Sequence, residues 1–242
     1  MSEQIPNSET RPVSGFNKLV LKGVGSVILT QGAQESLVIE ADPDIRSRIR
    51  SEVRDGTLTI SYDFDLISDV FGLRFIDVSP IRYHVNMINI NGISNSGAGT
   101  IQAGPIQSNT FELTMSGVGS VDFQSITAQS LAISLSGAGS IKVQTVAVPK
   151  MTVSLSGAGS IHIAGRADDQ QVRLSGVGSY EAGDLESQTA KASVSGAGSA
   201  TVWAKNTLDA SLTSVGSIKY YGTPSVTSHL TGLGKLSDLG NK

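Results

Sequence analysis

The segment SLSGAGSIKV, at residues 134–143, returns twenty residues later as SLSGAGSIHI, and related copies occur before and after these two. Each copy holds two glycines separated by one residue, and the copies from residue 97 onward start 20, 20, 20, 19, 20, 18 and 18 residues apart. The copies are Gly97/Gly99, Gly117/Gly119, Gly137/Gly139, Gly157/Gly159, Gly176/Gly178, Gly196/Gly198, the incomplete Ser214–Gly216 and Gly232/Gly234. A repeat this short cannot bury its apolar edge alone, so it indicates units that stack on one another.

Apolar residues occur at every second position on both sides of each glycine pair. In one copy they are Phe111, Leu113 and Met115 before the pair and Val121 and Phe123 after it. A period of two is typical of β-strands with one buried face. The alternation passes through the glycines without a shift, so both glycines fall in the inward row. There they let opposite walls approach closely or permit a corner in the strand. The pattern predicts an all-β solenoid with about 20 residues per coil.

The two rows of the alternation predict two environments. Short serine, alanine and valine side chains around the glycines fall in the outward row, where like residues of neighbouring coils would stack. Inward residues are expected to form apolar columns that include Leu113, Leu135, Leu155, Leu174 and Val194. Leu113 lies four residues before its glycine pair and the other four lie two before theirs, so two adjacent columns are expected.

The chain divides into three predicted regions: a flexible tail at 1–10, an N-terminal β region at 11–92 and the repetitive solenoid at 93–242. The N-terminal region contains one more glycine pair, Gly23/Gly25, with alternating apolar neighbours. The Asp55-Gly56 step lies between two strand-like segments, which is a hairpin signal.

An apolar insertion at 63–80 interrupts this region and contains Phe64, Phe71 and Phe75. A connecting segment this rich in apolar side chains is expected to cover something. It can fold back as a cap on an open end of the solenoid, whose strand edges otherwise invite aggregation. It can also be the surface that forms a homo-oligomer. Four aspartates in the insertion weigh against contact with lipid.

Composition excludes several classes of function. The net charge of −3 argues against nucleic acid as a partner, and the absence of cysteine excludes thiolate metal sites and nucleophiles. No apolar run is long enough to span a membrane, and the polar N-terminus predicts no signal peptide in this chain. The glycine pairs lack the residues that phosphate loops, dinucleotide sites and calcium-binding rolls require. We therefore expect no cofactor, no metal and no catalytic residues.

One surface feature is a candidate site. The third residue after each second glycine would stack with its counterparts on neighbouring coils, about 4.8 Å apart. These positions hold Gln102, Asp122, Lys142, His162, Glu181, Thr201 and Lys219, of which Asp122, Lys142, His162 and Glu181 would form a charged ladder. The ladder is open to two interpretations: alternating charges on a solvated sheet face, or a binding site, which would be catalytic only with a suitable cluster of carboxylates.

The chain resembles the GIN-domain family, described as adhesin heads of autotransporters. The resemblance is carried by RPVSGFNKLVLKGVGSVILTQG at 11–32, IRSEVRDGTLTISY at 49–62, the serial SGAGS copies and IKYYGTPSVTSHLTGLG at 218–234. The family often has aspartate or asparagine where this chain has Ser120, Ser140 and Ser160. The resemblance implies a right-handed parallel β-helix in the bacterial cell envelope, periplasmic or extracellular, and it carries no catalytic residues to transfer.

We therefore predict a non-enzymatic cell-envelope or extracellular module that binds a surface, with a glycan or another surface protein as partner. The alternative is a β-helix protein that binds or processes polysaccharide, since long solenoid faces suit extended glycans.

Overall fold

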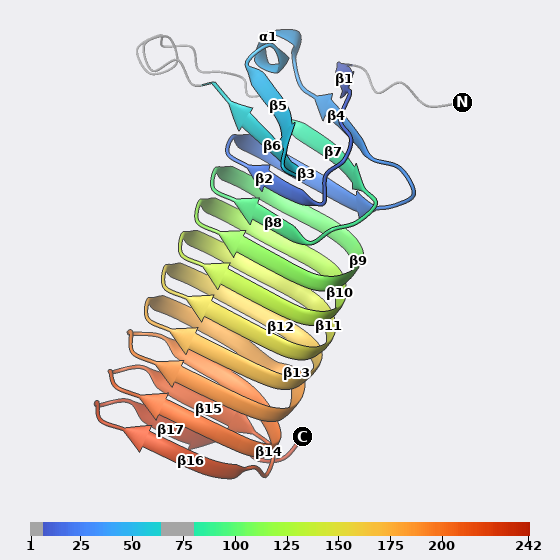
Figure 1. Ribbon diagram of the computed structural model, residues 1–242. Helices are drawn as coiled ribbons and strands as arrows, with labels where there is room; N and C mark the ends of the chain where they lie inside the picture. The colour runs from blue at the N-terminus through green and yellow to red at the C-terminus, as the bar shows by residue number, and fades with distance from the viewer. Residues whose placement is uncertain (1–6, 64–79) are drawn as a thin grey trace, which may run out of the picture.

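The protein forms a β-solenoid in a computed structural model that describes residues 7–63 and 80–242 (Figure 1). Its strands belong to one sheet that winds into a stack of about seven turns. Five long strands follow one another along the stack, and each pairs in parallel with the next. They are β9 (Ala98–Met115), β10 (Val118–Leu135), β11 (Ala138–Leu155), β12 (Ala158–Leu174) and β13 (Val177–Val194). This arrangement confirms the predicted solenoid and its repeat.

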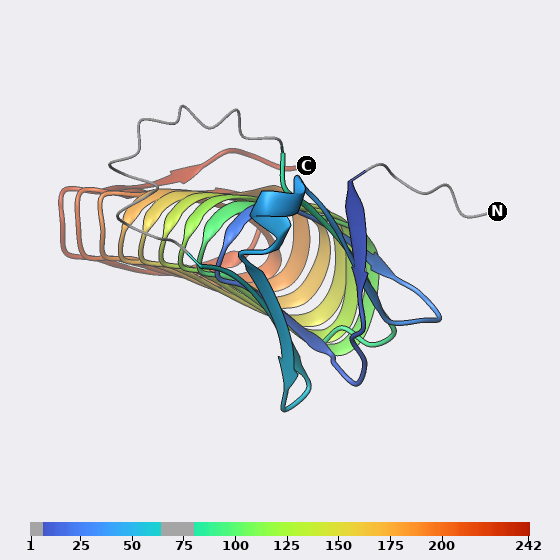
Figure 2. The same cartoon turned by 90° about the horizontal axis from the view of Figure 1, so that it is seen from above.

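Each coil bends where the alternation of buried and exposed residues breaks. In β11 the exposed pairs 144–145 and 149–150 interrupt the period of two, and the buried positions move by one residue after each pair. Two consecutive outward residues mark a corner, because the strand must change direction to return its next side chain to the interior. A third corner lies at the Ser-Gly step between strands. Figure 2 shows the coils from above, stacked with nearly the same outline.

The core consists of apolar columns that run along the stack. Ile133 pairs with Leu113 on one side and Val153 on the other, while Leu135 pairs with Met115 and Leu155. These side chains are buried, as are Leu174 and Val194 further along. The two adjacent columns predicted from the sequence are confirmed.

The glycines are required by contact between stacked coils. A Cβ added to Gly137 would lie 2.7 Å from the carbonyl carbon and oxygen of Ser116, and nearer still to the carbonyl oxygen of Gly117. The other glycine of the same pair meets the backbone of Gly119 in the same way. The sequence predicted an approach of opposite walls or a corner. A corner does lie at the Ser-Gly step, and the structure adds a further reason for glycine, because the backbone of the preceding coil leaves no room for a side chain at these positions.

The N-terminal region continues the same stack. β2 (Lys18–Leu21) and β3 (Val24–Gln31) pair in parallel with β8 (Gly92–Asn95) and β9. On their other side, β2 and β3 pair in parallel with β6 (Thr57–Tyr62) and β7 (Arg82–Met87). The sheet is thus continuous across residue 92, and the division into regions at that residue stays a prediction.

Antiparallel strands and a short helix lie at the N-terminal end of the stack (Figure 1). β4 (Ser36–Glu40) pairs with β1 (Ser8–Arg11) and with β7. β5 (Ile49–Arg54) pairs with β6 and follows α1 (Pro43–Arg46). The β5–β6 turn has positive φ at Asp55 and Gly56, which confirms the predicted hairpin. Phe64, Phe71 and Phe75 lie outside the described residues, so the cap and oligomer interpretations stay predictions.

Shorter strands build the last coils. β14 (Ser199–Leu212) pairs with β13, and two separate strands, β15 (Ser217–Tyr221) and β16 (Ser225–Leu230), pair in parallel with its two ends. β17 (Lys235–Asp238) then pairs with β15. The shorter 18-residue steps of the sequence correspond to these coils.

Gly137→Ala tests the role of the glycine contact. Its methyl group collides with the rigid backbone of the preceding coil, so we expect the free energy of unfolding to fall by roughly 1–3 kcal/mol or more. Gly104→Ala is the matched control, because a Cβ there meets nothing within 4 Å. Urea unfolding followed by circular dichroism measures both. Equal stability of the two variants would contradict the stacking explanation.

Candidate binding surface

The four predicted ladder residues lie side by side on neighbouring coils. Lys142 pairs in register with Asp122 and with His162, and His162 pairs with Glu181. Asp122 is half-buried and the other three are exposed. The next residue in the column, Thr201, is buried, so the exposed series ends at Glu181. We call these four residues the polar ladder.

A shallow groove adjoins the N-terminal end of the polar ladder. It has a volume of about 460 Å³, and Asp122 belongs to both features. The Nε2 atom of Gln144 donates a 3.3 Å hydrogen bond to the Asp122 carboxylate. The groove is lined by Ile28, Leu29, Thr30, Gln102, Ala103, Gly104, Asp122, Gln124 and Gln144. The amide and hydroxyl groups donate and accept hydrogen bonds and the carboxylate accepts them, so together they match a ligand rich in hydroxyl groups.

Sequence reasoning missed Gln124 and Gln144. Each lies two residues after a member of the polar ladder, and a period of two places both on the same outward side. It also missed Ile28 and Thr30, which come from β3 and reach the groove because β3 pairs with β9. The first pair could have been found from the repeat.

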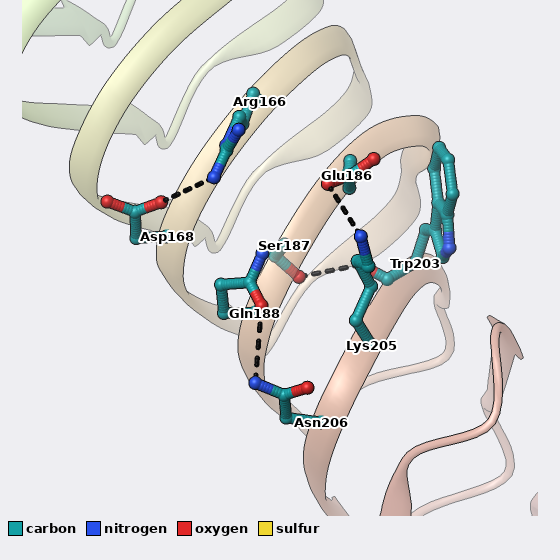
Figure 3. Close-up of polar contacts among 8 residues, drawn as sticks. All are labelled: Arg166, Asp168, Glu186, Ser187, Gln188, Trp203, Lys205 and Asn206. Atoms are coloured by element: carbon teal, nitrogen blue, oxygen red, sulfur yellow. Dashed lines mark hydrogen bonds and ion pairs between the residues drawn. The ribbon is translucent and has the colours of Figure 1, made fainter.

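A second polar surface joins β12, β13 and β14 (Figure 3). Lys205 forms an ion pair with Glu186 at 3.3 Å, and Asn206 donates a hydrogen bond to Gln188 at 3.2 Å. Within β12, Arg166 lies 3.6 Å from Asp168. Glu186 and Gln188 are half-buried and the other four side chains are exposed, so each ion pair contributes roughly 0–1 kcal/mol to stability. The contacts of Lys205 and Asn206 connect β14 to β13.

A buried network of polar side chains lies beneath this surface. Tyr180 donates a 3.0 Å hydrogen bond to the Gln170 amide oxygen, and the Gln170 amide nitrogen donates to Ser187 at 2.9 Å. The Ser187 hydroxyl then donates to the backbone carbonyl of Trp203 at 2.6 Å. Burial raises the pKa of the Tyr180 phenol well above its ordinary value. The network fixes the backbone of Trp203 from inside the coil.

The site chemistry of the described residues is limited. Residues 7–63 and 80–242 contain no group of three or more histidines or carboxylates that could hold a metal ion. In the same ranges, no helix has the length and apolar character to cross a membrane. The surface of the sheet carries a regular row of hydrogen-bonding and charged side chains.

Comparison with known families matches residues 15–145 and 124–224 to the family described as "Putative auto-transporter adhesin, head GIN domain". A search of the curated proteins finds no match. Among solved structures, a "putative adhesin" from Bacteroides fragilis is 27% identical, with a TM-score of 0.71 over 97% of this chain and 96% of that chain.

Two further structures show the same fold at lower identity. A "Putative lipid binding protein" from Parabacteroides distasonis is 23% identical, with a TM-score of 0.86 over 97% of each chain. A "putative adhesin" from Parabacteroides merdae is 19% identical, with a TM-score of 0.85 over 96% of this chain and 95% of that chain. At these identities the likeness establishes the fold alone.

His162→Ala tests whether the polar ladder contributes to stability. The side chain is exposed, so we expect the free energy of unfolding to change by no more than about 0.5 kcal/mol. Its neighbour Ile161 is buried, and Ile161→Ala should destabilise the protein by about 2–5 kcal/mol. Thermal unfolding measures both, and a loss of several degrees for His162→Ala would show that the ladder is structural.

Tyr180→Phe tests the buried network through pH. A tyrosine whose folded pKa is raised stabilises the fold fully below its unfolded pKa, about 10, and that stabilisation is lost as pH rises further. We expect the free energy of unfolding to fall above pH 10 and to fall less steeply in the variant. Burial also raises the pKa of Tyr83 and of Tyr220, and both contribute to the loss that remains. Denaturant titrations below and above pH 10 measure this, and identical slopes would contradict it.

Proposed function

Because this chain belongs to the GIN-domain family of adhesin heads, we propose that it is a non-enzymatic module of the cell envelope or the extracellular space that binds a surface polymer. The ligand class we propose is an extended glycan. Support comes from the family, from a structural relative described as a "putative adhesin" at 27% identity, and from the form of the exposed sheet.

The observation that carries the proposal is the continuity of the groove with the polar ladder. Both features use Asp122, and the ladder then extends over three further coils through Lys142, His162 and Glu181. Successive ladder side chains are separated by one strand spacing, about 4.8 Å. A long hydroxylated chain laid along the stack could therefore meet a donor or acceptor at every coil.

The scaffold supports this use because it holds the ladder rigidly. Parallel pairing continues on both sides of β10, β11 and β12, so the backbones that carry the ladder are hydrogen-bonded in both directions. Beneath the ladder, Val121, Ile141 and Ile161 are buried. Groups held in place before binding lose less conformational entropy when the ligand arrives.

The polysaccharide-processing alternative gains no support from the polar ladder. Its two carboxylates, Asp122 and Glu181, lie three coils apart. Three strand spacings correspond to about 14 Å. Paired catalytic carboxylates of glycoside hydrolases lie about 5–9.5 Å apart. This separation suits contacts along a chain better than cleavage of one bond.

A glycan array probed with the purified protein tests the proposal. The double variant Asp122→Ala/Gln144→Ala removes a carboxylate and an amide from the groove, and we expect it to weaken binding about tenfold, since each hydrogen bond contributes roughly 0.5–1.5 kcal/mol. The control is Glu112→Ala/Lys150→Ala, which alters a second groove formed by other residues.

The outcomes distinguish whether the protein binds a glycan from where on its surface the glycan binds. Retained binding in the control and loss in the double variant would support the proposal. Binding that both variants retain would place the site elsewhere, and an array with no bound glycan would reject a glycan as the ligand.

A further inference from the structure

Two aromatic side chains stack on neighbouring coils beyond the C-terminal end of the polar ladder, two residues after Thr201 and Lys219 of the same column. Trp203 on β14 pairs in register with Tyr221 on β15, and both are half-buried. Figure 3 shows Trp203 on the coil next to Glu186 and Ser187. Its backbone carbonyl accepts the hydrogen bond from Ser187, so the buried network holds this position.

An ammonium group occupies the space beside both rings. The Nζ atom of Lys242 lies 4.7 Å from the centre of the Tyr221 ring and 5.7 Å from the centre of the Trp203 ring. It donates a 2.8 Å hydrogen bond to the carbonyl oxygen of Gly183 and forms an ion pair with Asp184. Two π faces, one carbonyl and one carboxylate therefore converge on one cation, and each of these groups attracts an ammonium ion.

An irregularity in the backbone of β13 contributes to this arrangement. The register between β13 and β14 shifts between Ala182 and Glu186, so residues 183–185 form a bulge. The bulge carries both the Gly183 carbonyl and Asp184. A Cβ on Gly183 would lie 3.0 Å from the Tyr221 ring, so glycine allows the ring to approach closely. Bulges commonly redirect side chains at functional positions.

The lysine contact itself is exposed and therefore exchangeable. The Asp184 side chain is 65% exposed and the Lys242 side chain is 32% exposed. Exposed ion pairs and exposed cation–π contacts are individually weak. The segment that carries Lys242 is held separately by backbone bonds, from Leu239 to Tyr220 and from Gly222 to Gly240. The ammonium group can therefore leave while its segment stays in place.

We propose that Trp203, Tyr221, Asp184 and the Gly183 carbonyl form a recognition site for a primary alkylammonium group, which the chain's own Lys242 occupies in this structure. The external ligand is a lysine side chain of a partner protein. A lysine fits because its ammonium arrives on a slender methylene chain, as the present occupant does. The site shares no residue with the polar ladder or its groove, but it adjoins the ladder, since the charge of His162 acts on Asp184. The hydrogen bond from Lys242 lowers the pKa of Asp184, and the charge of Lys242 acts in the same direction.

Intrinsic fluorescence reports on this site directly, because Trp203 is the single tryptophan of the chain. Lys242→Ala should empty the site and change the Trp203 emission, whereas Lys235→Ala, at another lysine near the same end of the stack, should leave it unchanged. Butylammonium chloride should return the emission of Lys242→Ala toward that of the unsubstituted protein, with a dissociation constant on the order of 10 mM. Sodium chloride at equal ionic strength controls for salt.

A second variant and two further probes decide the assignment. Adding Asp184→Asn to Lys242→Ala should weaken the butylammonium response about fivefold or more, since a neutral amide replaces the carboxylate. Nα-acetyl-lysine amide should act like butylammonium, and glucosamine at the same concentration should not. An unchanged emission in Lys242→Ala, or an equal response with and without Asp184→Asn, would overturn the site. A response to glucosamine as strong as the response to the lysine derivative would overturn lysine as the ligand.

Discussion

The close contact between stacked glycines is the constraint on which the rest of the structure depends. Gly117, Gly137 and Gly157 meet the backbone of the preceding coil so closely that no side chain fits between them. This contact repeats at one point in successive turns, so it keeps the coils in register with one another. Parallel pairing and the apolar columns then continue from coil to coil with little change, because each coil repeats the geometry of its neighbour.

Because the coils stay in register, outward side chains recur at a regular spacing, while the residue type at each outward position can vary. Inward positions must be apolar and similar in size, since each packs against its counterparts above and below. Outward positions face solvent, and the column that contains Asp122, Lys142 and His162 changes its charge at every coil without disturbing the fold. The scaffold can therefore present different side chains at one fixed spacing, which suits a module whose role is to bind an extended surface.

Interruptions of the repeat bring together polar and aromatic groups that a regular repeat would keep apart. The bulge at 183–185 turns Asp184 and a backbone carbonyl toward Tyr221, which lies two coils further along. The Lys242 segment then folds alongside β15 and places its ammonium between these groups. A strictly periodic solenoid would place like residues above one another and would not bring these four groups together.

The sequence by itself determined the solenoid, the inward columns and the alignment of the polar ladder, because a period of two and a repeat of about 20 residues specify which side chains share a face. It also indicated the hairpin at Asp55-Gly56, whose conformation is local. Only the tertiary structure decided why the glycines are needed, since their obstacle is the backbone of another coil. Only the tertiary structure showed that Ile28 lines the groove and that Lys242 contacts Trp203. Both contacts join segments that are distant in the sequence, and they form where the repeat is interrupted.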